Sequence, residues 1–206
     1  MEPFEVPFGR PRVERADAAR NRRHLLETAR EMIAEHGTEK VTMDALAERA
    51  GLGKGTVFRR FGTRAGIFAA LIDDDERRFQ HAVLSGPPPL GPGAEPVQRL
   101  IAYGRARIAF LLDHLALARA AMDRNRTLPA AGATLSQLHI RMLLGQARPD
   151  IGDELDGLTL QLTAALEGPL LYVPAMDAVE LPVSGDALPL AESWQVLVEG
   201  LARPGR

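Results

Sequence analysis

The sequence contains no cysteine, which excludes disulfide bonds, thiolate metal ligands and cysteine nucleophiles. It also has no apolar run that approaches the ~20 residues a membrane-spanning helix needs. Its first residues carry charges and prolines instead of an apolar core, so we expect no secretion signal. These absences predict a cytoplasmic protein.

Signatures of catalysis are missing as well. No nucleophile–base pair stands out, and Gly53–Thr56 looks like a phosphate-binding loop but lacks the first glycine and the preceding strand. The five histidines do not have the spacing of metal ligands; they are His24, His36, His81, His114 and His139. We therefore expect no metal, no cofactor and no enzymatic activity. A helical enzyme remains the alternative, which a hydrolase screen would test.

Composition and charge are those of an ordinary globular protein. The 206 residues, 46% hydrophobic and 25% charged, suffice for one or two domains. The net charge of -2 does not by itself favour nucleic-acid binding. However, residues 1–64 carry 13 basic and 10 acidic side chains, whereas residues 65–206 carry 12 and 17. The basic excess therefore lies in the N-terminal part of the chain, which gives modest support to DNA binding there.

The stretch Val41–Phe61, VTMDALAERAGLGKGTVFRRF, predicts two short helices joined by a tight turn. Thr42 is placed to cap the first helix, and the charge of Asp44 suits the helix dipole in the first turn. Gly51 ends that helix, because glycine tolerates the left-handed conformation of a helix stop. The second helix opens at Gly53. Its expected apolar side consists of Val57, Phe58 and Phe61.

Two such helices form a helix-turn-helix, a unit that reads DNA. The order T-x-x-x-L-A-x-x-A-G-L-x-K-G-T-V-F-x-x-F resembles the N-terminal domain of the TetR family of transcriptional regulators. The resemblance covers about residues 20–71 and is specific, because the turn, glycine, lysine and aromatic positions match together. One departure is Phe58, where the family usually has a tyrosine whose phenol contacts a phosphate.

We expect the second helix of this motif to enter the major groove. Arg59 is the first candidate for a base contact, because arginine can donate two hydrogen bonds to guanine. Gly53 and Gly55 would let the backbone approach DNA, and basic and hydroxyl side chains would hold phosphates. The expected DNA-binding residues are Thr42, Gly53, Lys54, Gly55, Thr56, Phe58, Arg59, Arg60, Thr63 and Arg64.

Helical periodicity recurs along the chain and no stretch alternates like a strand, so we expect an all-α fold of about nine helices, as the resemblance also implies. Besides the helix-turn-helix pair, the expected helices span residues 20–37, 64–83, 97–114, 115–126, 130–148, 153–172 and 190–202. An acidic run within the 64–83 helix, Asp73–Glu76, is interpreted as a solvated face.

Four segments follow from this reading. Residues 1–19 are an irregular arm, either a disordered leader or a basic arm that touches DNA. Residues 20–84 form the helix-turn-helix domain with a connecting helix. Residues 85–96, with five prolines and three glycines, form a linker. Residues 97–206 form a ligand-binding and dimerisation domain.

The resemblance implies an inducer pocket enclosed by the helices between residues 97 and 172. Few charges interrupt these helices, which favours an apolar or amphipathic ligand. The candidate lining residues are Tyr103, Arg107, Phe110, Met122, His139, Met142, Leu143, Gln161 and Leu162. Each has an alternative role: methionines commonly fill cores, and polar side chains can satisfy a buried backbone group or lie at an interface.

Residues 155–171 are apolar on more than one face, and such a helix needs cover on both sides. The resemblance implies a homodimer formed by the last two long helices, and a two-fold dimer reads a palindrome. The expected interface residues are Leu158, Leu162, Leu166, Trp194, Leu197 and Leu201. The alternative is a helix buried wholly within its own domain.

The motif and its resemblance together predict a sequence-specific DNA-binding transcriptional regulator. We expect a repressor that a small-molecule ligand releases from a palindromic double-stranded DNA operator. Two alternatives stay open. The protein could bind DNA through its helix-turn-helix without any inducer pocket, or it could activate transcription, because the sign depends on the position of the operator.

Overall fold

The computed structural model describes residues 12–121, 131–172 and 190–203, and these residues contain nine α-helices and no strand. The expected all-α class is confirmed. The chain forms two compact units, which divide between Leu71 and Ile72. This division falls inside the fourth helix, α4 (Arg64–Ser85).

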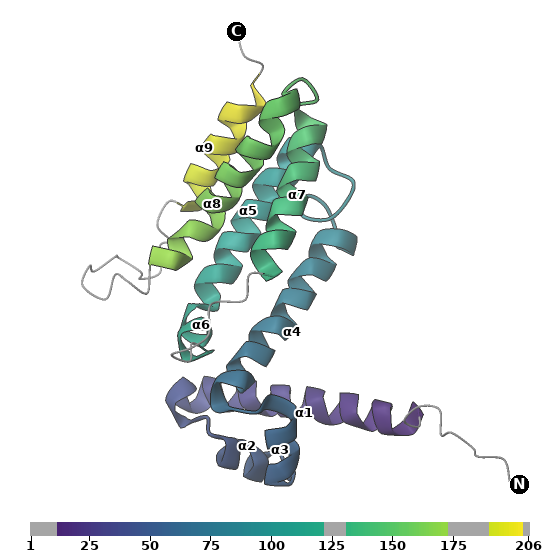
Figure 1. Cartoon of the computed structure of the whole chain (residues 1–206), viewed down its shortest axis with the longest axis vertical. Coiled ribbons are helices and arrows are strands. Elements are labelled where there is room, and N and C mark those ends of the chain that lie inside the picture. The colour runs from purple at the N-terminus through teal and green to yellow at the C-terminus, as the bar shows by residue number, and fades with distance from the viewer. Residues whose placement is uncertain (1–11, 122–130, 173–189, 204–206) are drawn as a thin grey trace, which may run out of the picture. The chain divides into compact units, whose positions relative to one another are not determined.

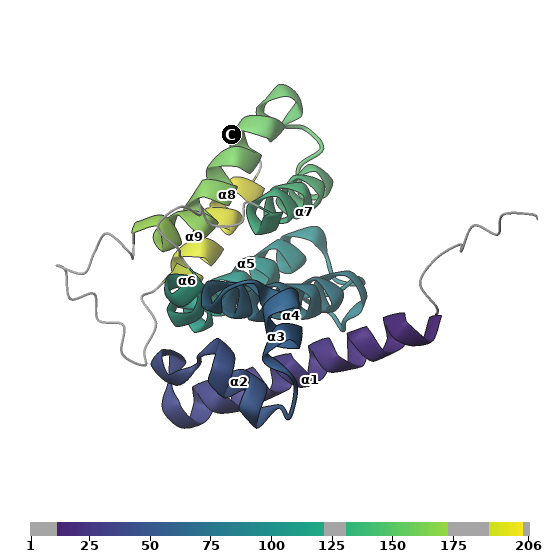
Figure 2. The ribbon, with the colours of Figure 1, turned by 60° about the horizontal axis from the view of Figure 1, so that its bottom comes forward.

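The first unit contains three helices and the start of α4 (Figures 1 and 2). They are α1 (Arg12–His36), α2 (Met43–Arg49) and α3 (Lys54–Phe61), with a short 3-10 helix, η1 (Thr38–Lys40), between α1 and α2. One face of each helix supplies apolar side chains to a common core. Its buried members are Leu25, Leu26, Ala29, Met32, Val41, Leu46, Ala47, Ala50, Val57, Ile67, Phe68 and Leu71.

Helix α1 begins at Arg12, so the irregular arm expected over residues 1–19 is wrong from that residue onward. The segment RVERADAAR that follows Pro11 contains no glycine or proline, and alanine, arginine and glutamate are good helix formers. Asp17 and Arg20 also form an i,i+3 ion pair on the helix surface. Residues 1–11 lie outside the described residues.

The second unit contains the end of α4 and five further α-helices. They are α5 (Pro96–Asp113), α6 (Leu115–Ala121), α7 (Ala131–Ala147), α8 (Leu155–Tyr172) and α9 (Leu190–Ala202), with a 3-10 helix, η2 (Gly152–Glu154), before α8. Helix α5 lies against α7, α8 and α9, and α7 lies against α8 (Figure 1). Their shared core includes Leu100, Ile108, Ile140, Leu143, Leu144, Leu162, Leu166, Trp194 and Val198.

The proline- and glycine-rich segment interrupts helical structure between Ser85 and Pro96, as expected. It does not separate the two units, because both α4 after Leu71 and α5 belong to the second one. Phe79 and Val83 of α4 pack into the core of that unit, which explains the assignment. The segment therefore joins two helices of one helical bundle.

Three of the expected interface residues are core residues instead. Leu162, Leu166 and Trp194 are buried within their own chain. The Trp194 indole lies directly over Gly104 of α5, and its Nε1 donates a hydrogen bond to the Leu100 carbonyl oxygen at 3.0 Å. The expectation failed because an apolar residue on a helix looks the same in sequence whether its own domain or a partner covers it.

None of the described helices meets the length and hydropathy of a membrane span.

Candidate DNA-binding surface and ligand pocket

The turn between α2 and α3 is fixed by local hydrogen bonds at both ends of α2. The Thr42 hydroxyl oxygen accepts a hydrogen bond from the Ala45 amide at 3.1 Å, which confirms the expected cap. Gly51 has φ +64°, the left-handed conformation that glycine adopts at low cost. The amides of Gly51 and Leu52 donate back to the carbonyls of Glu48 and Ala47, which closes the helix end. The direction in which the chain enters α3 is therefore set by the sequence itself.

Helix α3 divides into a buried and an exposed side. Val57 is fully buried and Phe61 is half-buried. Phe58, which we expected on the apolar side, is 65% exposed, so that expectation is wrong. One residue along a helix turns the side chain by about 100°, and Val57 already occupies the direction of the core. Phe58 therefore stands on the outer surface, as a contact with DNA would require.

The basic side chains of α3 differ in how closely other residues of the protein hold them. The exposed Arg59 guanidinium reaches the Thr56 hydroxyl only at 3.5 Å, which is a long contact. Lys54 pairs with Asp44 at 2.9 Å, with both side chains exposed to solvent. Arg60 donates to the Ala18 carbonyl of α1 at 2.9 Å. Arg59 is thus the arginine of α3 whose guanidinium is held least, and the DNA contacts of all three stay predictions.

Arg64 and Thr63 organise the junction between α3 and α4. Thr63 accepts a hydrogen bond from the Gly66 amide at 3.1 Å and so caps α4, as expected. The Arg64 guanidinium donates to the carbonyls of Thr38 and Val41, both at 2.7 Å, and lies 5.0 Å from the centre of the Phe68 ring. Arg64 therefore has a structural role inside the first unit. A phosphate contact by this residue stays a prediction, with two donor groups already engaged.

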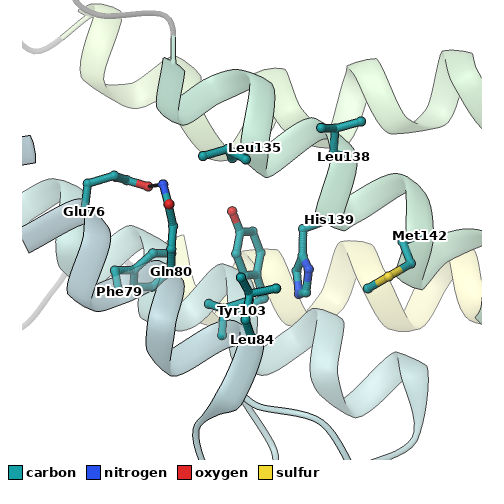
Figure 3. Close-up of a pocket in the computed structure, with 10 residues that line it drawn as sticks. Glu76, Phe79, Gln80, Leu84, Tyr103, Leu135, Leu138, His139 and Met142 are labelled. Carbon is teal, nitrogen blue, oxygen red and sulfur yellow. Dashed lines mark hydrogen bonds between the residues drawn. The ribbon is translucent and has the colours of Figure 1, made fainter. Parts of the chain in front are cut away.

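The second unit contains a pocket of about 210 Å³ between α4, α5 and α7 (Figure 3). It is lined by Glu76, Phe79, Gln80, Val83 and Leu84 of α4, Tyr103 of α5, and Leu135, Leu138, His139 and Met142 of α7. Three of the expected lining residues are among them: Tyr103, His139 and Met142. The contribution of α4 was missed because its apolar spacing indicated only a connecting helix.

The other expected lining residues lie elsewhere. Leu143 and Leu162 are buried in the core, and Gln161 is exposed on α8. The Phe110 ring stacks on His114, with the ring centres 4.1 Å apart. Arg107 belongs to an ion network beside the pocket, and Met122 lies outside the described residues. Helical spacing alone did not distinguish a pocket wall from a packed core.

His139 is the unusual polar residue of the pocket. Its side chain is buried, with 9% exposure, and its Nε2 atom has no hydrogen-bond partner among the described residues. Its ring lies beside the Tyr103 ring, with the centres 4.6 Å apart (Figure 3). Burial, helped by the charge of Arg99, lowers the pKa of His139 to about 4. The imidazole is therefore neutral at physiological pH.

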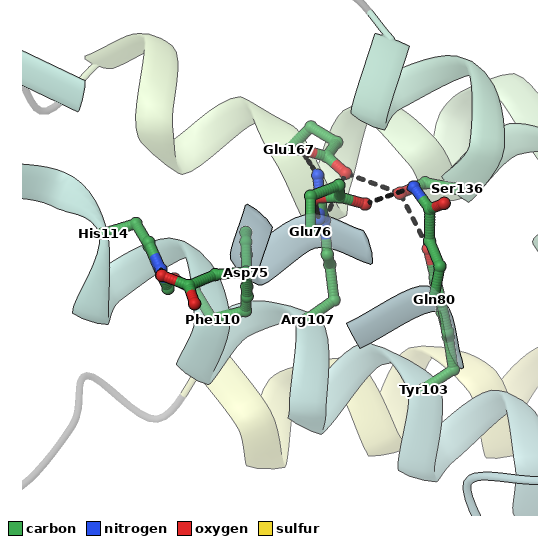
Figure 4. A network of polar contacts seen from close by, with 9 residues as sticks. All are labelled: Asp75, Glu76, Gln80, Tyr103, Arg107, Phe110, His114, Ser136 and Glu167. Atoms are coloured by element: carbon green, nitrogen blue, oxygen red, sulfur yellow. Dashed lines mark hydrogen bonds and ion pairs between the residues drawn. The ribbon is translucent and has the colours of Figure 1, made fainter. Parts of the chain in front are cut away.

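A buried ion network lies next to the pocket and joins four helices (Figure 4). The Arg107 guanidinium contacts Glu76 of α4 at 2.5 Å and Glu167 of α8 at 2.9 Å. Ser136 of α7 donates to Glu167 at 2.7 Å, and the Tyr103 hydroxyl donates to Ser136 at 2.8 Å. Burial raises the pKa of Tyr103 to about 12, so this hydroxyl stays protonated. The polar groups of α4, α5, α7 and α8 are thus coupled to one another.

The acidic run of α4 is only partly the solvated face that we expected. Asp73 is exposed, but Asp75 contacts His114 at 3.0 Å and Glu76 binds Arg107. The expectation is wrong for these two residues, because Arg107 of α5 and His114, directly after α5, lie against them. Within the described part of the chain, no three His, Asp or Glu side chains are grouped so that they could hold a metal ion.

The outer faces of α8 and α9 carry exposed apolar side chains: Leu160, Val196 and Leu197. Leu197 was an expected interface residue. Leu158 and Leu201, which were also expected there, are half-buried against the core of their own unit. Dimer formation through this surface stays a prediction.

A capped helix-turn-helix, joined in one chain to a helical unit with an apolar pocket, defines a DNA-binding regulator of the helix-turn-helix class. Residues 25–71 match the family model for bacterial regulatory proteins of the tetR family. The chain is 27% identical over 187 residues to an HTH-type transcriptional repressor of Mycobacterium tuberculosis, which covers 82% of this chain and 96% of that protein. It is 38% identical over 63 residues to the repressor AcnR of Corynebacterium glutamicum, which covers 31% of this chain and 34% of AcnR.

Solved structures show the same fold. A putative TetR-family regulator from Mesorhizobium loti superposes with a TM-score of 0.59 at 20% identity, covering 89% of this chain and 96% of that one. A complex of SmeT with triclosan superposes with a TM-score of 0.54 at 20% identity, covering 91% and 96%. Residues 25–71 thus match the N-terminal domain of the tetR family, and the chain as a whole shares the fold of solved TetR-family regulators.

Proposed function

We propose that this regulator represses transcription from a palindromic operator and that a small molecule bound in the second unit releases it. The exposed side of α3 carries the proposal. It presents Lys54, Phe58 and Arg59 to the exterior, on a helix whose entry is fixed by the capped turn. Repression is supported by the names of the two bacterial relatives. A regulator of this kind acts in the cytoplasm and is not an enzyme.

The operator would be read by α3 in the major groove. Arg59 is the candidate for guanine, whereas Lys54, Arg60 and Thr63 would hold phosphates and fix the register. Gly53 and Gly55 support a close approach, since a Cβ atom added at either position would meet no described atom of the protein within 4 Å. The free surface of these glycines is thus available to the DNA backbone or base edges.

A two-fold dimer would present two copies of α3 to the two halves of a palindrome. The exposed apolar residues Leu160, Val196 and Leu197 on α8 and α9 support a surface of this kind. A dimer would remove their apolar area from water, which favours association.

Release by a ligand is supported by the position of α4. This helix is continuous from Arg64 to Ser85, and its later residues Glu76, Phe79 and Gln80 line the pocket. A ligand there would contact the same helix that begins beside the helix-turn-helix. To shift the equilibrium, it must bind the released conformation more tightly than the DNA-bound one. The pocket favours this reading over a DNA-binding protein without an inducer.

Binding to DNA fragments from the region upstream of the protein's own gene, measured across a salt series, tests the proposal. We expect tight, sequence-selective binding to a palindrome, with affinity that falls steeply as salt rises. Equal and weak binding to every fragment would contradict an operator-specific role. Addition of a ligand that fills the pocket should lower the affinity for the palindrome.

A further inference from the structure

His139, in the wall of the pocket, has a buried polar atom with no hydrogen-bond partner among the described residues. Four polar side chains line the pocket: Glu76, Gln80, Tyr103 and His139. Glu76 accepts hydrogen bonds from Arg107 and from Gln80, and the Tyr103 hydroxyl donates to Ser136. Nε2 of His139 has no partner among the described residues. A buried polar group without a partner is costly, so an occupant that forms a hydrogen bond with Nε2 would gain binding free energy from it.

The remaining wall of the pocket is apolar and its volume is small. Phe79, Leu135, Leu138 and Met142 supply most of the lining beside the rings of Tyr103 and His139 (Figure 3). An apolar protein cavity of about 150 Å³ holds a benzene molecule. A pocket of about 210 Å³ therefore suits a single ring with a short substituent. The neighbouring aromatic rings favour a ring in the ligand as well, through offset or edge-on contacts.

The charges around the pocket favour an uncharged occupant. The Glu76 carboxylate lies in the pocket wall and disfavours an anion. Glu76 already has Arg107 as its cationic partner, so it does not require a cationic ligand either. A cation would lose its hydration in a lining that is otherwise apolar. The charge of Arg99 also acts on His139 and would favour a carboxylate, which makes a carboxylate the competing class. The neutral imidazole itself can accept or donate a hydrogen bond, depending on its tautomer.

We propose that the pocket takes an uncharged single-ring molecule of the phenol class, whose hydroxyl forms a hydrogen bond with Nε2 of His139. The inference rests on the proposed function, in which the occupant of this pocket is the releasing ligand. His139 is then the residue that determines specificity, since the apolar wall accepts any ring of suitable size. A hydrogen bond of this kind distinguishes a phenol from the same ring without its hydroxyl.

Titration of the full-length protein with three matched probes tests the inference. The probes are 4-ethylphenol, ethylbenzene and 4-ethylbenzoate, with binding followed by calorimetry and by the ¹⁵N resonance of His139. We expect 4-ethylphenol to bind about two- to tenfold more tightly than ethylbenzene, the value of one neutral hydrogen bond. It should also shift the His139 Nε2 resonance, and 4-ethylbenzoate should bind most weakly.

Two substitutions of His139 and one matched control separate its role from a loss of folding. His139→Leu should bind 4-ethylphenol and ethylbenzene equally, whereas His139→Gln, which retains a hydrogen-bonding group, should recover part of the preference. His81→Leu changes an exposed histidine of α4 that does not line the pocket, and it should behave like the parent protein. Thermal unfolding of each variant establishes that it is folded.

Three results would overturn the inference: no binding of any probe, equal binding of 4-ethylphenol and ethylbenzene by the parent protein, or tightest binding of 4-ethylbenzoate. Operator affinity, measured in parallel, separates this inference from the proposed function. If 4-ethylphenol binds through His139 without weakening operator binding, the pocket assignment stands and ligand release is contradicted. If the operator is bound but no probe enters the pocket, only the pocket assignment fails.

Discussion

Nη1 of Arg107 lies 2.5 Å from Oε2 of Glu76, and this ion pair ties α5 to the part of α4 that belongs to the second unit. The same guanidinium binds Glu167 of α8, and it is only 4% exposed. The two carboxylates hold the pKa of Arg107 above its ordinary value although burial opposes the charge. Arg107 of α5 therefore balances the carboxylates of α4 and α8 and links the three helices.

Replacement of Arg107 by methionine should destabilise the protein strongly. The change keeps a long side chain but leaves Glu76 and Glu167 partly buried without their cation. Loss of one partner from a buried ion pair typically costs about 3–5 kcal/mol in the free energy of unfolding, which urea denaturation would measure. Arg105→Met on the same helix is the control, because Arg105 is exposed and its ion pair should contribute less than about 1 kcal/mol. Equal losses in the two variants would contradict a central role for Arg107.

Replacement of Arg59 by alanine should relax operator specificity at one or two base pairs and cost about 1–3 kcal/mol on the correct operator. The reason is that a base contact is lost while the phosphate contacts remain.

Lys54→Ala should instead weaken binding to all sequences alike and flatten the dependence on salt. Binding isotherms on an operator and on single-base variants, each over a salt series, measure both effects. Uniform weakening by Arg59→Ala would remove it from the base contacts.

The helix-turn-helix could be predicted from the sequence because its signals are local. Thr42 caps α2, Gly51 ends it with a positive φ, and Thr63 caps α4, each within a few residues of the atoms it bonds. Such features depend on neighbours in the chain and not on distant packing. The same local logic failed at the start of α1, where charge and proline in the preceding residues hid a good helix-forming segment after Pro11.

The second unit could be predicted only in outline, because its details depend on which helix faces meet. Trp194 was assigned to a partner subunit, yet it fills the space above Gly104 within its own chain. Glu76 was assigned to solvent, yet it meets a buried arginine 31 residues further along the chain. Hydrophobic periodicity identifies the buried side of a helix but not the element that covers it. The pocket was missed on α4 for the same reason.

Gly55 in α3 allows a test of close approach to DNA without damage to the fold. Gly55→Ala adds a methyl group that meets no described atom within 4 Å, so the helix should gain up to about 1 kcal/mol of stability. Operator affinity should nevertheless fall if the α3 backbone lies against DNA. Gly157→Ala in α8, which has the same free space and lies outside the first unit, is the control for the gain in helix stability. Unchanged operator binding by Gly55→Ala would show that this face of α3 stands away from the DNA.

His139 should make the stability of the protein depend on pH in the acid range. Its pKa is lowered to about 4 by burial and by Arg99, below the ordinary value of 6.5 that it has when unfolded. Between these two values the unfolded chain binds a proton that the folded protein does not. The contribution is therefore fully present above pH 6.5 and is lost progressively as the pH falls towards 4, by up to about 3 kcal/mol.

Urea denaturation of the parent and of His139→Leu across this range isolates the effect, because other titrating groups are common to both. The difference in unfolding free energy should change with pH in this window and level off outside it. A constant difference between the parent and His139→Leu would mean that the imidazole is protonated as easily in the folded protein as in the unfolded chain, and hence that the pocket is open to water at Nε2.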